Sequence, residues 1–138
     1  MRRIPMSTYT IRELSKLTNT TASTLRYYEE IGLLTAVKRD GKNRIYNDSH
    51  LARLHAIQCF KNTGMPIAKM QDFFRYEENI PCHIDDIIEL VTEHETDIET
   101  QIAVLQRELS HIRHKVRYYN GIKEAITENR CWPKWEDV

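Results

Sequence analysis

A cluster of hydroxyl, cationic and phenolic side chains around position 24 suits the binding of phosphate oxygens. Thr21, Ser23 and Thr24 offer hydroxyls, Arg26 offers a guanidinium, and Tyr27 offers a phenol. Hydroxyls and helix amides bind phosphate, and a guanidinium also pairs with O6 and N7 of a guanine. The cluster therefore predicts contacts with the backbone and the base edges of a nucleic acid.

A second group of polar residues follows in the segment 36–47. Asp40-Gly41 stands between two short runs of β-forming residues, which is a strong hairpin signal. Basic residues crowd the tip of this hairpin, so it is not expected in a core. We interpret it as a wing that lies along a nucleic-acid backbone, with Arg39, Arg44 and Tyr46 as candidate contacts.

Two short helices are expected to position the first cluster. Thr10-Ile11-Arg12-Glu13 has the form of a capping box at the start of the first helix. Thr21 is expected to cap the second helix, which carries Leu25 and Tyr28 on one face and stops at Gly32. Two short helices joined by a polar turn make a helix-turn-helix, whose second helix enters the major groove of DNA.

Two further helices are expected to complete a small core. Asp48 is predicted to cap the third helix, and Pro66 suits the first turn of the fourth. Lys61 lies near their junction, where it either contacts phosphate or is an ordinary solvated lysine. The residues expected to face inward are Leu51, Leu54, Ile57, Ile67, Met70, Phe73 and Phe74.

The net charge of zero hides an asymmetry between the two parts of the chain. Residues 1–76 hold 13 basic and 6 acidic side chains, a net charge of +7, and residues 77–138 hold 7 basic and 14 acidic ones, a net charge of −7. Such a division suggests a part that binds a polyanion and an acidic, solvated part. By itself it is also compatible with two ordinary soluble surfaces.

One long helix is predicted over residues 84–119, which contain neither glycine nor proline. From Ile102 to Tyr119 the apolar residues recur at alternating steps of three and four, the heptad rhythm of a coiled coil. An identical chain supplies the partner helix by two-fold symmetry, so we expect a homodimer. The alternative is packing against a different protein.

Several classes of protein are disfavoured. No apolar stretch reaches the length of a membrane span, and the first residues lack a signal-peptide core, so we expect no membrane partner and a cytoplasmic location. No phosphate-binding loop, metalloprotease helix or catalytic triad is found, so we expect neither an enzyme nor a cofactor. In the tail, Trp132 and Trp135 are expected to pack against a partner or to fray.

These motifs together resemble the MerR family of bacterial transcription regulators. The matching segments are Thr24-Leu25-Arg26-Tyr27-Tyr28-Glu29, Ile31-Gly32-Leu33-Leu34 and Arg44-Ile45-Tyr46, followed by the long helix. The resemblance implies a dimer that binds a palindromic site in double-stranded promoter DNA and distorts the DNA for RNA polymerase. In that interpretation Arg26, Tyr27, Arg44 and Tyr46 contact DNA.

We therefore expect a mainly α fold, with a winged helix-turn-helix followed by a long antiparallel dimerisation coiled-coil helix. The expected parts are a DNA-binding domain at 7–76, a linker and dimerisation helix at 77–120, and a short C-terminal tail at 121–138. Residues 121–138 are too few for a large ligand-binding domain.

Three alternatives concern the signal to which such a regulator would respond and whether it is a regulator at all. Cys59 matches the position of a cysteine in small family members that respond to aldehydes and other electrophiles, but a free cysteine is also often an inert apolar residue. Cys82 and Cys131 suggest a soft-metal-responsive regulator as an alternative, although we assign no metal site. A non-regulatory, architectural DNA-binding protein is the remaining alternative.

Overall fold

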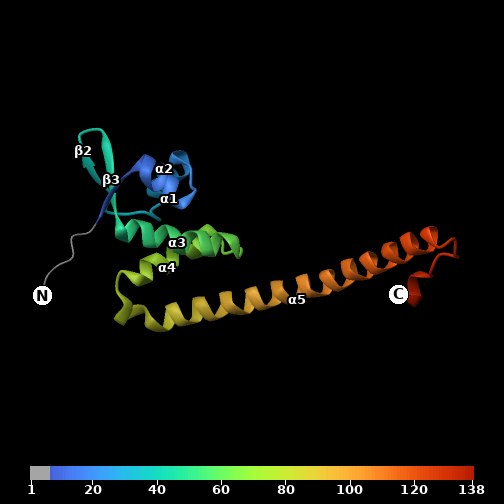
Figure 1. Ribbon diagram of the computed structural model, residues 1–138. Coiled ribbons are helices and arrows are strands. Elements are labelled where there is room, and N and C mark those ends of the chain that lie inside the picture. The colour runs from blue at the N-terminus through green and yellow to red at the C-terminus, as the bar shows by residue number, and fades with distance from the viewer. Residues whose placement is uncertain (1–6) are drawn as a thin grey trace, which may run out of the picture. The chain divides into compact units, whose positions relative to one another are not determined.

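The computed structural model describes residues 7–138 and is mainly helical, with one small sheet, as predicted (Figure 1). In chain order its elements are β1 (Thr8–Thr10), α1 (Ile11–Thr18), α2 (Ala22–Glu30), β2 (Lys38–Asp40), β3 (Asn43–Asn47), α3 (Asp48–Asn62), α4 (Ile67–Glu77), α5 (Ile80–Thr127) and the 3-10 helix η1 (Trp135–Asp137).

The helix-turn-helix forms as its caps predict. Thr10 Oγ1 accepts from the amide of Glu13 at 3.1 Å, and the Glu13 carboxylate accepts from the amide of Thr10 at 3.2 Å, which confirms the capping box. Asn19 takes the left-handed conformation, with φ of 50°, and turns the chain between the helices. Thr21 then caps α2, because its Oγ1 accepts from the amide of Thr24 at 3.1 Å.

The sheet has three strands in the order β1-β3-β2, all antiparallel. The predicted hairpin is confirmed as β2 and β3, with Gly41 at φ of +63° in its turn. β1 was not predicted. It is a three-residue strand that pairs Thr8 with Asn47 and Thr10 with Ile45, and so it anchors the wing to the start of α1.

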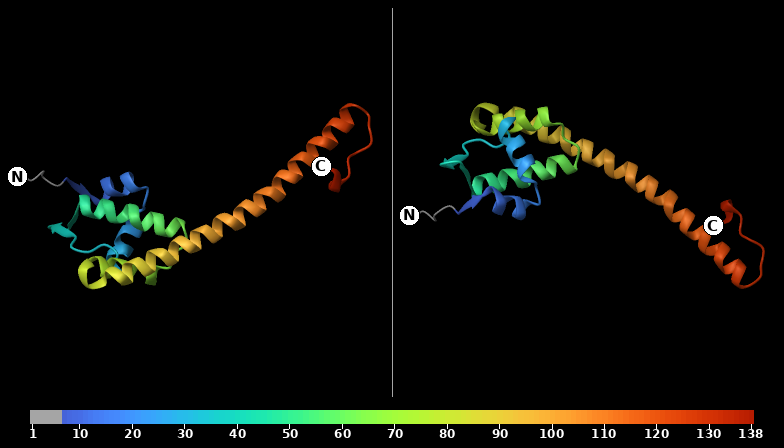
Figure 2. Two further views of the ribbon diagram at one scale, coloured as in Figure 1. Left: turned by 90° about the horizontal axis from the view of Figure 1, so that it is seen from below. Right: turned by 90° about the horizontal axis from the view of Figure 1, so that it is seen from above.

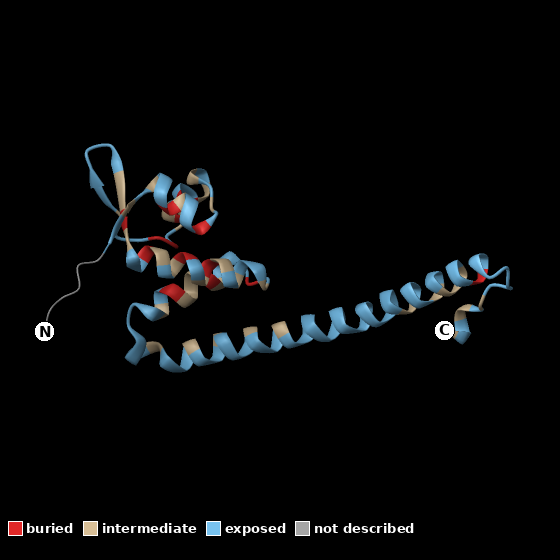
Figure 3. Ribbon diagram, in the orientation of Figure 1, coloured by how far each residue is buried: buried red, intermediate tan, exposed pale blue. Residues whose placement is uncertain are grey.

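A compact apolar core holds α1 to α4 and the sheet together. Leu14, Leu25 and Leu54 are fully buried, and each contributes about 1.5–3 kcal/mol by leaving water. Figure 3 shows most of the buried residues, in red, in this part of the chain. Among the residues expected to face inward, Ile67 does not, since it is 40% exposed.

The start of α3 differs from the prediction by one residue. Asn47 is the N-cap, with its Oδ1 accepting from the amide of Ser49 at 2.9 Å, and Asp48 is the first helical residue. The difference arises because β3 continues to Asn47 and leaves no loop before the helix. Asp48 instead accepts from the hydroxyl of Tyr9 at 2.6 Å, and this bond raises the pKa of Tyr9 above its usual value.

The long helix is confirmed and exceeds the predicted range at both ends, although His83 has a non-helical backbone near its start. Its apolar stripe is uncovered in the single chain, with Leu105 67% and Ile112 53% exposed. The chain divides into two compact units between Val91 and Thr92, within this helix. The domain boundaries expected from the sequence stay predictions. No helix within residues 7–138 is long and apolar enough to cross a membrane.

Trp135 of the tail packs on the end of its own α5 and is not frayed, while packing of the tail against a partner stays a prediction. Both views in Figure 2 show the last residues running back beside the final turns of this helix. His114 Nε2 lies 2.7 Å from the carbonyl oxygen of Trp135, and the two rings are 4.1 Å apart. Trp132, by contrast, is 62% exposed.

Candidate nucleic-acid interface

The start of α2, which is the predicted recognition helix because it is the second helix of the helix-turn-helix, opens onto a hollow of about 640 Å³ that gathers three of the predicted contacts. Thr21 and Thr24 line it from the helix start, and Lys61 lines it from the end of α3. The Thr21 hydroxyl lies 2.8 Å from that of Thr24. Hydroxyls, helix amides and an ammonium group together are suited to hold a phosphate.

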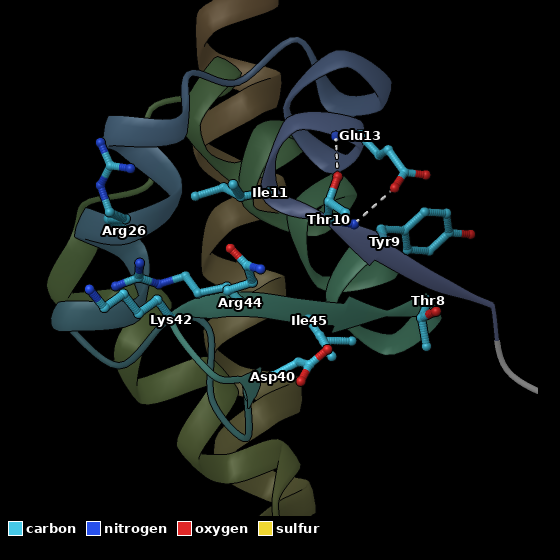
Figure 4. A pocket seen from close by; sticks show the side chains of 11 residues that line it. Thr8, Tyr9, Thr10, Ile11, Glu13, Arg26, Asp40, Lys42, Arg44 and Ile45 are labelled. Carbon is cyan, nitrogen blue, oxygen red and sulfur yellow. Dashed lines mark hydrogen bonds between the residues drawn. The ribbon is translucent and has the colours of Figure 1, made fainter.

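A second hollow, of about 590 Å³, separates the recognition helix from the wing. Figure 4 shows Arg26, which projects from α2, and Lys42 and Arg44, which come from the hairpin, among the side chains that line it. Two carboxylates also line it, that of Asp40 from the hairpin and that of Glu13, which is held in the capping box with Thr10. Three cations from two elements at one hollow are suited to an approaching phosphate backbone.

Glu29 ties the wing to the recognition helix, a role that the sequence did not indicate. Arg39 and Arg44 are direct partners across β2 and β3, where two like charges repel. The Glu29 carboxylate lies 2.7 Å from Arg44 Nε and 3.7 Å from a terminal nitrogen of Arg39. Arg44 is therefore partly used inside the protein, whereas the side chain of Arg39 is 51% exposed.

Tyr46 does not fit its predicted role. Its side chain is fully buried, so it does not reach DNA in this conformation. Tyr46 is the fourth of the five residues of β3, next to the start of α3, and its ring meets that of His50 edge to face at 5.6 Å. Burial, with a smaller effect of the negative charge of Glu29, raises the pKa of Tyr46.

The other predicted contacts on α2 lie at the surface. Ser23 and Arg26 are exposed, and Tyr27 is 44% exposed. The next residue, Tyr28, is buried with its ring 6.1 Å from that of Tyr27. This division between neighbouring tyrosines agrees with the expected core role of Tyr28 and leaves Tyr27 available to a partner.

Two side chains of α3, which sequence reasoning overlooked, hold the interface in place. Gln58 donates to the carbonyl of Thr18 and to Thr20 Oγ1, and so fixes the turn between α1 and α2. Arg53 donates to the hydroxyl of Thr35 at 3.3 Å and stacks over Phe74 at 4.7 Å. The partners of both side chains lie far away in the sequence, so no local pattern indicates these contacts.

The three cysteines are free and exposed. Cys59 is on α3, Cys82 is near the start of α5, and Cys131 is in the tail. Among residues 7–138 no group of three or more histidine, cysteine or acidic side chains is arranged to hold a metal ion.

Comparison with known proteins agrees with this geometry. The family model for MerR HTH family regulatory proteins matches residues 9–77, and a model described as MerR, DNA binding, matches residues 51–115. An uncharacterised HTH-type transcriptional regulator of Haemophilus influenzae is 37% identical over 123 residues, which cover 84% of this chain and 87% of the relative.

Solved structures show the same likeness. HiNmlR, described as a MerR family regulator lacking the sensor domain and bound to promoter DNA, has a TM-score of 0.79 at 30% identity, over 90% of this chain and 92% of its own. A MerR family regulator from Bacillus thuringiensis has a TM-score of 0.71 at 32% identity, over 80% of this chain and 98% of its own.

Proposed function

The chain belongs to the MerR family of DNA-binding transcription regulators, and from this premise we propose that it acts as a homodimer that binds and distorts a palindromic promoter site. RNA polymerase is its second proposed partner. The observation that carries the proposal is the hollow between α2 and the wing, lined by Arg26, Lys42 and Arg44. It offers cations to one stretch of DNA from two elements that Glu29 holds in register, Lys42 and Arg44 to the backbone and Arg26 to a base edge.

Dimerisation is supported by the exposed stripe of α5. Ile102, Leu105, Leu109, Ile112, Val116 and Tyr119 are all large, apolar and between 45% and 67% exposed. A single chain that left such a stripe in water would lose the stabilisation that its burial provides. An antiparallel coiled coil with a second copy covers it and presents two recognition helices to two half-sites.

Distortion of DNA is supported by the division of contacts within the interface. Most of the cationic and hydroxyl groups at the two hollows suit phosphates rather than bases. Contacts of that kind fix the path of the backbone, and a dimer with two such surfaces bends or untwists the segment between them when that path differs from straight DNA.

For the signal, we propose that an electrophile or thiol oxidant acts at Cys59. Its exposure on α3 supports access by a small reagent. Promoter output in response to diamide or an aldehyde is expected to change, and Cys59→Ala is expected to abolish that change. Replacement of Cys82 or Cys131 is the matched control, and an unaltered response in the Cys59 variant excludes this thiol.

The DNA-binding proposal is tested with the full chain and its own upstream promoter region. Binding is expected to be specific at low salt and to weaken steeply as ionic strength rises. Transcription from a promoter with a long spacer between its polymerase elements is expected to depend on the protein. Binding without any effect on transcription would favour an architectural protein, and no binding at low salt would contradict the proposal.

A further inference from the structure

A third hollow, of about 360 Å³, lies on the C-terminal half of α5, and none of its lining residues is among the predicted DNA contacts. Its lining is cationic, aromatic and hydroxylic: Arg107, Ser110, His111, His114, Arg117 and Trp135. The first five come from successive turns of one helix face, and Trp135 comes from the tail that folds back onto it.

The tail residue is fixed in place by several contacts. The Trp135 ring lies 4.1 Å from the His114 ring, 5.2 Å from that of Tyr118 and 6.1 Å from that of His111. Lys115 Nζ lies 5.3 Å from the ring centroid, a cation–π contact. The indole therefore forms a defined wall of the hollow.

The hollow lies on the side of α5 opposite the apolar stripe, away from the seam of the proposed dimer. Arg107, His111 and His114 each follow a residue of the apolar stripe by two positions, after Leu105, Leu109 and Ile112. Two residues correspond to a rotation of about 200° around a helix. These side chains thus occupy the outer positions of the heptad, opposite the seam of the proposed coiled coil.

The charge of the lining is unbalanced. Within residues 7–138 the ion pairs involve neither Arg107 nor Arg117, although Glu136 and Asp137 follow Trp135 in η1. Two guanidinium groups, two imidazoles and a hydroxyl thus line one hollow beside an indole. Guanidinium groups bind carboxylates and phosphates with two parallel hydrogen bonds, and an aromatic wall adds contact area for a planar ligand.

We propose that this hollow binds a small organic anion that carries a carboxylate or a phosphate group, with Arg107 and Arg117 as its charge partners and Trp135 as its aromatic wall. In the regulator proposed above, the hollow serves as an effector site on the outside of the dimer. That role rests on the proposed function, whereas the binding itself does not.

Trp135 makes the proposal measurable. In the full chain with Trp132→Phe, Trp135 is the sole tryptophan and reports on the hollow by its fluorescence. Benzoate and inorganic phosphate serve as the two anionic probes, and neutral benzamide is the control ligand. A saturable change is expected with an anion at low millimolar concentration, and benzamide is expected to bind at least about tenfold more weakly because it lacks the charge.

Arginine-to-glutamine variants of α5 remove a positive charge either inside or outside the hollow. Arg107→Gln and Arg117→Gln, singly and together, are expected to weaken anion binding, by about tenfold or more for the pair. Arg113→Gln removes an exposed cation of the same helix that does not line the hollow, and it is expected to bind as the parent does. Glutamine keeps helix propensity high, so α5 is expected to stay folded.

The outcomes separate this proposal from the previous one. Equal binding by the double variant and Arg113→Gln, or a response that only grows with ionic strength, overturns the anion site. A stronger response to phosphate than to benzoate assigns the phosphate class, and the reverse assigns the carboxylate class. Without ligand, the double variant is expected to bind the operator as the parent does. If the parent itself does not bind the operator, the proposed function as a regulator is contradicted and the anion site is not.

Discussion

The carboxylate of Glu29, on the recognition helix, lies 2.7 Å from Nε of Arg44, on the wing. Both side chains are less than a quarter exposed, at 22% and 23%, so solvent weakens this pair less than it weakens a surface pair. Because Arg39 lies directly opposite Arg44, the same carboxylate also offsets a repulsion between strands. One acidic residue thus links both strands of the wing to α2, in addition to the pairing of β1 with β3.

Glu29→Gln is expected to lower the free energy of unfolding by about 1 kcal/mol and to weaken operator binding severalfold, because the wing loses its brace. Glu30→Gln is the matched control, since it removes the same charge from the exposed neighbour. Loss of a negative charge alone favours DNA binding, so Glu30→Gln is expected to bind as well as the parent or better. Equal strengthening in both variants would contradict the brace.

Arg26→Ala is expected to weaken operator binding by about tenfold and to relax the sequence preference at one position of each half-site, as expected for a contact to a base. Lys42→Ala, at the same hollow, is expected to weaken binding to all sequences alike and to reduce the salt slope by about one. The affinities of each variant for operator DNA and for mismatched DNA, measured over a range of salt concentrations, give both the sequence preference and the salt slope. Equal effects of the two changes on preference would contradict the assignment of α2 as the base-reading helix.

Tyr46→Phe tests the corrected placement of this residue. Among the described residues the buried Tyr46 hydroxyl has no hydrogen-bond partner, so its removal is expected to leave stability unchanged or to raise it by about 1 kcal/mol. Operator binding is expected to stay the same. A loss of DNA affinity with unchanged stability would show that Tyr46 turns toward DNA in the complex after all.

The raised pKa of Tyr46 also predicts the alkaline behaviour of the protein. Above the ordinary tyrosine value of 10.0 the unfolded chain loses this proton while the folded chain keeps it. The folded state then binds more protons, so stability falls as pH rises from about 10 toward the raised pKa. Urea unfolding of the parent is expected to show this fall, and Tyr46→Phe is expected to reduce it.

Local signals in the sequence predict most of the helices and strands, whereas contacts between residues distant in the sequence cannot be predicted from such signals. The capping box at Thr10 and the Asp40-Gly41 turn are complete within a few residues, so both were predicted correctly. β1 has three residues and depends entirely on its pairing with β3, and a strand that short has no recognisable period.

The same limit explains the errors at the candidate site. The place of Tyr46 in the basic hairpin and the family resemblance predict a DNA contact, but packing against α3 decides which side chains of β3 are buried. Glu29 belongs to the Arg-Tyr-Tyr-Glu segment, but the sequence does not indicate its role. Its partners Arg39 and Arg44 come close to it only after the wing folds. Asn47 and Asp48 are both good caps, and the length of β3 decides between them.

The dimer is tested by placing a charge in its seam. Leu109→Glu is expected to shift the protein from dimer to monomer in sedimentation equilibrium and to lower operator affinity, because a buried carboxylate has no partner there. Thr100→Glu adds the same charge at an exposed outer position of α5 and is expected to stay dimeric. Two variants that sediment alike would place the partner surface elsewhere.

Gly121→Ala tests whether the tail is held against α5 by close packing. A Cβ at this position would lie 3.0 Å from Cγ of Pro133, so either the proline ring or the tail must shift. The helix itself gains up to about 1 kcal/mol from alanine, and the cost of the displaced tail offsets that gain. With Trp132→Phe in the background, the emission of Trp135 is expected to move toward that of a solvated indole.

Asn120→Ala, at the exposed neighbouring position, changes helix propensity without approaching Pro133 and is expected to leave that emission unchanged. An unshifted spectrum in Gly121→Ala would mean that the tail accommodates the methyl group and that Pro133 does not set the position of the indole.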